Sequence, residues 1–294
     1  MKISQISKLF AWSLGLVLLY TGTTFAQRIS SPLQESHSRQ EVLQELSKAS
    51  VVYLGETHDS AEDHKAQLAI LQELHRQNPK IAIAMEMFQR PYQNVIDQYL
   101  AGQLTETELV EKSEYNQRWG FPWEYYAPIL QFANSNRLPV LALNTPSEVT
   151  RKVVREGLEG LAETDRQYIP TATEIDLSNA EYRQMVLDSF KQHQQAGHGS
   201  SANFERFFLA QVLWDETMAD VIAQFLKQNP GYQVVVLAGQ GHVIYGYGIP
   251  SRVERRMAGF AGESFQQRLI LLNSDSDFPS VSDKPVADFF WKSE

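Results

Sequence analysis

Five short apolar segments punctuate the chain, and each predicts a buried strand. Four of them are nearly continuously apolar and rich in Val, Ile, Leu and Ala, namely Val51–Glu56, Ile81–Phe88, Pro139–Thr145 and Gln233–Gly239. The fifth, Arg268–Asn273, has a similar pattern. Apolar runs without polar alternation are typical of a parallel sheet covered on both faces. We therefore expect these segments to pair in one mainly parallel sheet.

The segments between these runs predict helices, namely Ser60–Gln77, Tyr92–Ala101, Pro122–Asn136 and Ser147–Leu161. The first ends at Asn78-Pro79, which is a helix stop signal. Alternation of strands and helices favours an α/β fold with right-handed crossovers. The predicted fold class is therefore α/β, with a mainly parallel central sheet flanked by helices.

The region at about 168–228 breaks this alternation because it has no strand signal. Its pattern predicts two helices, Asn179–Gln195 and Asn203–Gln228, joined by the Gly- and Ser-rich linker Ala196–Ser201. Such a linker is typical of a loop. We interpret the region as a helical insertion that packs over one end of the sheet, within a single domain at 27–294.

The first 26 residues have the pattern of a secretory signal peptide. Lys2 and Lys8 precede an apolar run from Leu9 to Tyr20, and Thr24-Phe25-Ala26 resembles a cleavage site. The alternative is an uncleaved anchor, although this run is shorter than the roughly 20 residues that a bilayer core requires. We expect export to the periplasm or an equivalent lumen.

Charge and cysteine content exclude several classes of site and partner. The whole chain carries a net charge of −9, and the predicted leader contributes two of its lysines and no acid. An acidic chain without a basic cluster is a poor nucleic-acid binder. The chain has no cysteine, which excludes disulfides, thiolate metal sites, cysteine nucleophiles and a lipidated N-terminal cysteine.

Polar side chains follow the carboxyl ends of the predicted strands. In parallel sheets, this is the edge at which ligands bind. The first strand runs into Gly55-Glu56-Thr57-His58, and the fourth runs into Gly239-Gln240-Gly241-His242. Glu86 lies near the end of the second strand, and Asn144 near the end of the third. We expect Glu56, His58, Glu86 and His242 to meet at one edge of the sheet.

Two kinds of chemistry suit this set. His58, Glu86 and His242 are ligand types that bind Zn, Mn or Fe. Alternatively, they perform general acid–base catalysis, with Glu56 acting as a base or orienting His58. Structural roles are the third interpretation: the histidines bind loop backbone, and Glu86 forms an ion pair with Arg90.

Two further groups are candidates for ligand contact. Five of the eight residues from Trp119 to Tyr126 are aromatic, including Tyr125 and Tyr126. They predict either a loop that packs onto a helix or a platform for a ligand. Gln211, Trp214, Asp215 and Met218 recur at helical spacing and share one face, which is placed to look down on the strand-end site.

As an ordered set, the motifs resemble the ChaN-like haem-binding lipoprotein family over about residues 40–257. The motifs are Leu54-Gly-Glu-Thr-His-Asp59, Met85-Glu-Met-Phe88, Gln211-x-x-Trp-Asp-x-x-Met-Ala219, Leu237-Ala-Gly-Gln-Gly-His-Val243 and Gly248-Ile-Pro250. The resemblance implies haem binding, with two haems stacked between the subunits of a homodimer and a tyrosine as iron ligand. It also implies a role in iron uptake at the cell envelope, with a transport component as partner.

This resemblance leaves the haem ligand open among Tyr125, Tyr126, Tyr182, Tyr245 and Tyr247. It makes Tyr125, Tyr126, Gln211 and Asp215 the candidates for cofactor binding. The family resembles the TIKI/TraB proteases and the erythromycin esterases, which share paired Gly-x-x-His motifs and a Glu on a related scaffold. The alternative function is therefore a metal-dependent hydrolase that uses His58, Glu86 and His242.

Overall fold

The computed structural model describes residues 29–30, 36–193, 203–260, 265–274, 278 and 284–293. The predicted leader at 1–26 and the predicted linker at 196–201 lie outside this part of the chain. Within the described residues, no helix has the length and apolar character needed to cross a membrane.

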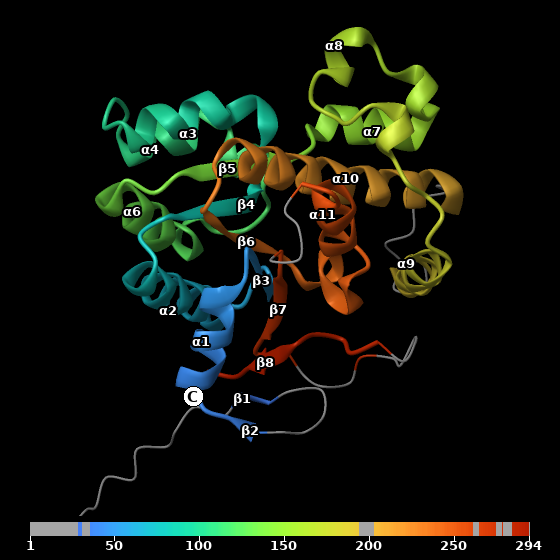
Figure 1. Ribbon diagram of the computed structural model, residues 1–294. Coiled ribbons are helices and arrows are strands. Elements are labelled where there is room, and N and C mark those ends of the chain that lie inside the picture. Colours follow the sequence, from blue (N-terminus) through green and yellow to red (C-terminus); the bar gives the residue numbers. More distant parts are fainter. Residues whose placement is uncertain are drawn as a thin grey trace, which may run out of the picture.

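The core of the molecule is one sheet with the strand order β2-β1-β8-β7-β3-β6-β4-β5 (Figure 1). Its six strands from β8 to β5 are all parallel, whereas β1 and β2 add an antiparallel edge. The strands are β1 (Ile29–Ser30), β2 (Ser36–His37), β3 (Val51–Glu56), β4 (Ile81–Gln89), β5 (Val140–Asn144), β6 (Gln233–Gly239), β7 (Gln267–Leu272) and β8 (Phe289–Trp291). The predicted fold class is confirmed.

All five predicted strands are present, and their bounds agree to within one residue. The sequence pattern missed β8, β1 and β2 because segments of two or three residues are too short to carry a periodic signal. Parallel β8 nevertheless completes the buried sheet, since Phe289 and Trp291 both belong to the core.

The helices are α1 (Arg39–Lys48), α2 (Ala61–Gln77), α3 (Gln93–Leu100), α4 (Glu106–Lys112), α5 (Tyr115–Arg118), α6 (Ala127–Asn136), α7 (Ser147–Glu156), α8 (Glu163–Arg166), α9 (Ala180–His193), α10 (Phe204–Gln228) and α11 (Ile249–Met257). Short 3-10 turns include η2 (Trp123–Tyr125), η3 (Leu158–Gly160) and η6 (Gln240–His242). Helix α7 ends before the predicted Leu161 because Gly157 adopts a left-handed φ of 80°.

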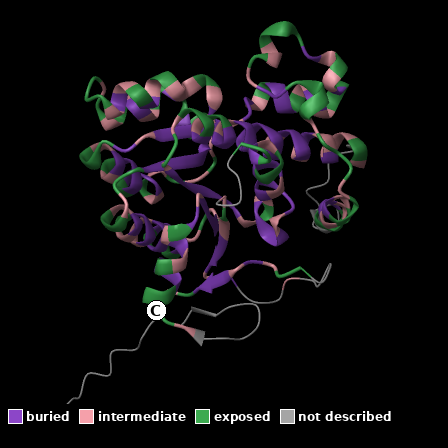
Figure 2. Cartoon of the chain, viewed as in Figure 1, coloured by how far each residue is buried: buried purple, intermediate pink, exposed green. Residues whose placement is uncertain are grey.

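Helices cover both faces of the sheet, which explains why its strands are continuously apolar. One face packs against α1, α2, α3 and α6, and the other against α9, α10 and α11. Alternate residues of β3 divide between the layers: Val52 and Leu54 face the first, and Val51 and Tyr53 face the second. Figure 2 shows the resulting distribution, with buried strands inside and exposed residues on the outer helix surfaces.

Helix α10 links the sheet to the region of the predicted insertion. Its C-terminal half packs on the sheet face through residues such as Met218, Ile222 and Leu226, so the helix covers the face rather than only one end. Its N-terminal half brings Gln211 and Asp215 to the loop that follows β6. The helix therefore belongs both to the core and to the strand-end site.

A buried cluster of charges locks α10 onto α11. Glu216 on α10 is fully buried and forms ion pairs with three arginines of α11. The N···O distances are 3.2 Å to Arg252, 2.7 Å to Arg255 and 2.6 Å to Arg256. A buried carboxylate is tolerated only when it is paired in this way. This cluster, which we call the Glu216 clamp, joins α11 to α10, the helix that carries Asp215.

Candidate functional site

Three adjacent strands deliver the predicted site residues to one edge of the sheet. Strands β3 and β4 both pair in parallel with β6, so their carboxyl ends meet. Glu56, the last residue of β3, lies in register with Gly239 at the end of β6. The loops that follow these two strands carry His58 and His242. The predicted meeting of Glu56, His58, Glu86 and His242 is present in the structure.

The first histidine belongs to a chain of hydrogen bonds from Tyr126 through Glu56 to His58. The His58 Nδ1–H donates to Glu56 Oε1 across 2.8 Å, and the Tyr126 hydroxyl donates to the same oxygen across 2.6 Å. Gln67 donates to the other carboxylate oxygen across 2.6 Å. Because Glu56 is fully buried, these bonds hold its carboxylate in one orientation.

The second histidine has an equivalent set of partners. The His242 Nδ1–H donates to Asp215 Oδ1 across 2.6 Å, and the Tyr182 hydroxyl donates to Asp215 Oδ2. Asp215 has no exposed surface, and Gln211 places its amide nitrogen 3.3 Å from His242 Nδ1. The site therefore contains two Tyr–carboxylate–His relays, built from separate elements.

Glu86 lies beside both relays. Its Oε2 accepts from the backbone N–H of Gly239 at 2.8 Å, and its Oε1 is 3.4 Å from His242 Nε2. Arg90 instead forms an ion pair with Asp220 at 3.5 Å, so the structural interpretation that paired it with Glu86 is wrong. The Glu86 carboxylate therefore interacts with Gly239 and His242 at the strand ends, and not with an arginine.

The electrostatics follow from this arrangement. Burial disfavours ionised Glu86, but the positive charge of His242, its hydrogen bond and the charge of His58 outweigh burial and lower the Glu86 pKa to about 2. Burial likewise opposes protonation of both histidines. The Glu56 hydrogen bond and Glu86 raise the His58 pKa, whereas Glu86 and Asp215 raise the His242 pKa well above its usual value.

Two cavities flank the histidines. The first, which we call the Trp119 cavity, has a volume of about 620 Å³. Trp119, Phe121 and Trp214 supply aromatic walls, and Asn144, Thr145 and the first turns of α7 complete it. The His58 ring meets Trp119 and Phe121 with centroids 4.8 and 4.9 Å apart. The predicted aromatic segment therefore contributes a wall to this cavity.

The second, the Met185 cavity, has a volume of about 650 Å³ and lies between the strand ends and the helices α9 and α10. Its lining includes Met185, Phe207 and Gln211. It shares His58, Phe121 and His242 with the Trp119 cavity. The two histidines thus stand where the cavities adjoin.

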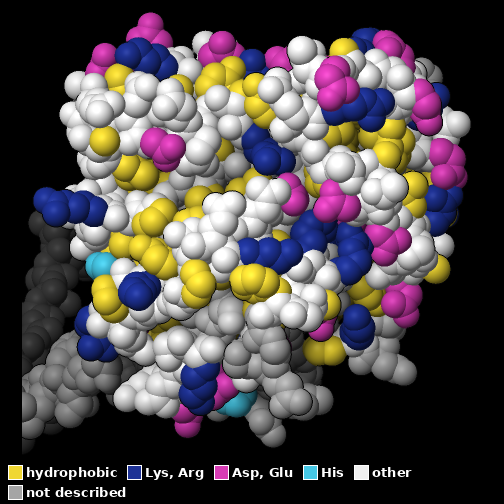
Figure 3. Space-filling model, turned by 45° about the horizontal axis from the view of Figure 1, so that its top comes forward, with side chains coloured by type: hydrophobic (Ala, Val, Ile, Leu, Met, Phe, Trp, Pro, Cys, Tyr) yellow, Lys and Arg dark blue, Asp and Glu magenta, His cyan; other side chains and the backbone are white. Residues whose placement is uncertain are grey.

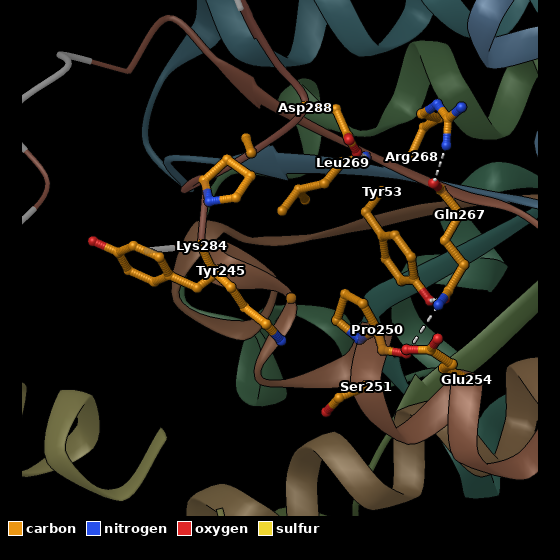
Figure 4. Close-up of a pocket in the computed structure, with 13 residues that line it drawn as sticks. Tyr53, Tyr245, Pro250, Ser251, Glu254, Gln267, Arg268, Leu269, Lys284 and Asp288 are labelled. Carbon is orange, nitrogen blue, oxygen red and sulfur yellow. Dashed lines mark hydrogen bonds between the residues drawn. The ribbon is translucent and has the colours of Figure 1, made fainter. Parts of the chain in front are cut away.

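A smaller cavity of about 300 Å³ lies apart from this site, between α11 and the start of β7 (Figure 4). There the Gln267 side chain accepts from the Tyr53 hydroxyl at 2.6 Å and donates to the Pro250 carbonyl at 3.2 Å. Arg268 donates to the Gln267 carbonyl at 3.0 Å. Since these polar groups satisfy one another, the strand-end cavities are the stronger candidates for a ligand site.

Residues 42–253 match the sequence profile of a family described as "Haem-binding uptake, Tiki superfamily, ChaN". This chain belongs to the ChaN family. A solved structure described as "Cofacial heme binding to ChaN of Campylobacter jejuni" has a TM-score of 0.69 at 19% identity, and the alignment covers 91% of this chain and 96% of that one. This similarity shows that the two proteins share a fold.

A curated relative in Arabidopsis thaliana is "Protein RETICULATA-RELATED 5, chloroplastic". It is 28% identical over 283 residues, which is 91% of this chain. The ChaN-family chain spans 37% of the length of that relative.

Tyr125 and Tyr126, which the sequence of this ChaN-family member makes candidates for cofactor binding, lie outside the lining of both cavities. Tyr126 is fully buried and donates its hydroxyl to Glu56. Tyr125 stacks on His64 with ring centroids 5.0 Å apart. Neither residue lines the Trp119 or the Met185 cavity. Their contacts make them supports of His58 and its surroundings, because Tyr126 fixes the carboxylate that orients that ring.

The structure does not bring His58, Glu86 and His242 together as a metal site. Across the part of the chain that the structure describes, no group of three or more His, Asp or Glu side chains is placed to hold a metal ion. The physical reason lies at His242, whose two ring nitrogens face Asp215 and Glu86. The hydrogen bonds instead match the alternative prediction in which Glu56 orients His58.

Sequence reasoning identified Asp215 and Gln211 by helical spacing but missed the roles of Gln67 and Tyr182. Gln67 lies on α2, 11 positions after Glu56, and Tyr182 lies on α9, 33 positions before Asp215. A polar residue on an otherwise apolar helix face is the signal that marks Gln67. Tyr182 has no comparable signal, because buried tyrosines are common in cores.

Proposed function

We propose that this ChaN-family protein binds haem in the Trp119 cavity, where His58 would hold the iron. The cavity is within the usual size range of small-molecule sites, about 300–1,000 Å³, and its aromatic walls suit a flat, largely apolar ring. When bound, haem would supply an iron centre for redox chemistry or would itself be the transported cargo. The chain would provide the residue that binds the iron and the pocket around the ring.

The geometry of His58 carries this proposal. Its Nδ1 is held by Glu56, and among the described residues its Nε2 makes no hydrogen bond. The side chain is 26% exposed and lines the Trp119 cavity. Metal-binding histidines commonly donate the other ring N–H to a carboxylate, which fixes the ring and raises its basicity. His242 is less suited because both of its nitrogens face carboxylates.

A haemin titration of the purified protein, followed by the Soret absorbance, tests this proposal. We expect saturable binding to the wild type and a strongly reduced affinity for His58→Ala. His75→Ala is the matched control, since His75 lies on α2 outside both cavities. Tyr125→Phe and Tyr126→Phe test the tyrosine alternative. If a tyrosine variant loses the spectrum and His58→Ala retains it, the assignment of His58 is wrong.

Export, a homodimer and a role in iron uptake through an envelope transport component stay predictions that accompany haem binding. The dimer is testable by sedimentation of the protein with and without haemin. A haemin-dependent shift from monomer to dimer would support the stacked arrangement that the family resemblance implies. A monomer that binds one haemin would exclude it.

A second candidate function is hydrolysis, and the paired relays favour it. Each histidine has a carboxylate on Nδ1, and Glu86 lies beside both, which is an arrangement that suits general acid–base work on a water molecule. Short-chain p-nitrophenyl esters provide a first assay. Hydrolysis that is lost in His242→Gln, in a variant that still binds haemin, would support this function. No hydrolysis by the wild type above background would reject it for this substrate class.

A further inference from the structure

Two residues that line the Trp119 cavity each carry a buried polar atom with no partner within the described residues. These atoms are the Thr145 hydroxyl and the side-chain oxygen of Asn144. Both residues line the cavity, and Thr145 is only 1% exposed. A buried polar group without a hydrogen-bond partner destabilises the fold, so such groups require an explanation. A polar group of a ligand in this cavity would satisfy them.

The start of α7 forms the same part of the cavity. Pro146 occupies the N-cap position and offers no side-chain hydrogen bond to the first turn. Ser147 and Thr150, on the first turn, line the cavity. The first N–H of the helix, that of Ser147, already donates to Gln89 Oε1 at 3.3 Å. The positive end of the helix dipole still favours an anion at this position. The helix start and the Thr145 hydroxyl therefore point to the same kind of ligand group.

Two arginines contribute to this end of the cavity, and their partners distinguish them. Arg118 already contacts Glu114 at 2.7 Å and Glu148 at 2.9 Å. Arg151 lies 3.9 Å from Glu148, and its side chain is 69% exposed. Arg151 is therefore the cation that can turn toward a ligand without breaking a close ion pair.

We propose that Thr145, the first turn of α7 and Arg151 form a subsite for a carboxylate of the ligand. The Thr145 hydroxyl donates to this carboxylate, and Arg151 neutralises it. The Asn144 oxygen accepts from a water that also donates to the carboxylate. This inference rests on the proposed haem-binding function and deepens it, because haem carries two propionates. Its propionate edge then faces α7, while His58 binds the iron.

The test compares two probes, haemin and haemin dimethyl ester, in which both carboxylates are blocked. We expect the wild type to bind haemin at least about tenfold more tightly than the ester. A tenfold difference in Kd corresponds to about 1.4 kcal/mol of binding free energy. Thr145→Val and Arg151→Gln should each reduce this preference by lowering the affinity for haemin alone. The valine has the shape of threonine, so only the hydroxyl is lost.

Arg155→Gln is the matched control, because Arg155 lies one turn further along α7 with the same 69% exposure and is outside the cavity lining. It should keep the full preference for haemin. An equal loss in Arg155→Gln would mean that unspecific attraction, and not the subsite, selects the carboxylate.

The outcomes separate the two proposals. If the wild type binds neither probe, the proposed function fails and the subsite fails with it. If it binds both probes equally, haem binding stands and the carboxylate subsite is overturned. Thermal unfolding of each variant, with a midpoint near that of the wild type, ensures that a changed preference reports the site and not the fold.

Discussion

Asp215 of α10 accepts a 2.6 Å hydrogen bond from His242, which lies 27 positions further along the chain in the loop after β6. This bond joins a helix that covers the sheet to the edge where the strands end. Together with the Glu56–His58 bond, it gives the site two oriented imidazoles. The side chains that hold these carboxylates come from α2, α9 and the segment before α6.

We expect Asp215→Asn to lower the pKa of His242, because it removes a negative charge and the acceptor that favours the protonated ring. NMR titration of the histidine side chains measures this decrease. Glu205→Gln, which alters an exposed carboxylate on the same helix, should leave the His242 titration unchanged.

Gly239 and Gly241 provide a matched pair for the packing of His58. A Cβ added to Gly239 would lie 2.8 Å from both Cε1 and Nε2 of the His58 ring, whereas a Cβ on Gly241 would meet nothing within 4 Å. Gly239→Ala should displace the ring and weaken haemin binding about 10–100-fold, the range for groups that orient a metal ligand. Gly241→Ala should bind haemin as the wild type does. Equal titration curves for both variants would show that His58 does not contact the ligand.

Acid should destabilise the fold through Glu86. Its pKa in the folded protein is about 2, below the value of 4.5 expected when unfolded. The stabilisation is therefore complete above pH 4.5 and is lost as the pH falls toward 2. Urea unfolding at several pH values should show this loss in the wild type. Glu86→Gln should flatten the curve across this window, and an unchanged slope would contradict the assignment.

The Glu216 clamp should dominate the stability of the α10–α11 contact. Glu216→Gln leaves three arginines without their shared counter-charge, so we expect a loss of about 3–5 kcal/mol in the free energy of unfolding. Urea denaturation measures this quantity. The exposed pair of Glu205 with Arg183 is the control, and its removal should cost no more than about 1 kcal/mol.

The parallel sheet and the site edge were predictable because continuous apolar runs and Gly-x-x-His loops are local signals. The same signals placed His58 and Glu86 correctly. They could not show that Tyr126 would point into the core, because an aromatic segment has the same pattern whether it lines a cavity or supports one. The Thr145 hydroxyl escaped notice for a related reason, since only the three-dimensional structure reveals which buried groups lack partners.

Charge shows a similar contrast between sequence and surface. The negative net charge is visible in the composition, but the arrangement of the charges is not. On the face drawn in Figure 3, acidic and basic side chains lie beside one another and apolar patches lie between them. On α7, Arg151 lies 3.9 Å from Glu148, whereas Arg118 lies 2.9 Å from the same carboxylate and is less exposed.

The central claim is that His58 binds the haem iron, and chemical rescue tests it most directly. Resonance Raman spectra of the reduced haem complex should show an iron–imidazole band in the wild type and none in His58→Gly. Addition of imidazole should restore the band in the variant, because free imidazole replaces the missing side chain. An unchanged band in His58→Gly, or a phenolate signal that disappears in a Tyr→Phe variant, would contradict the account.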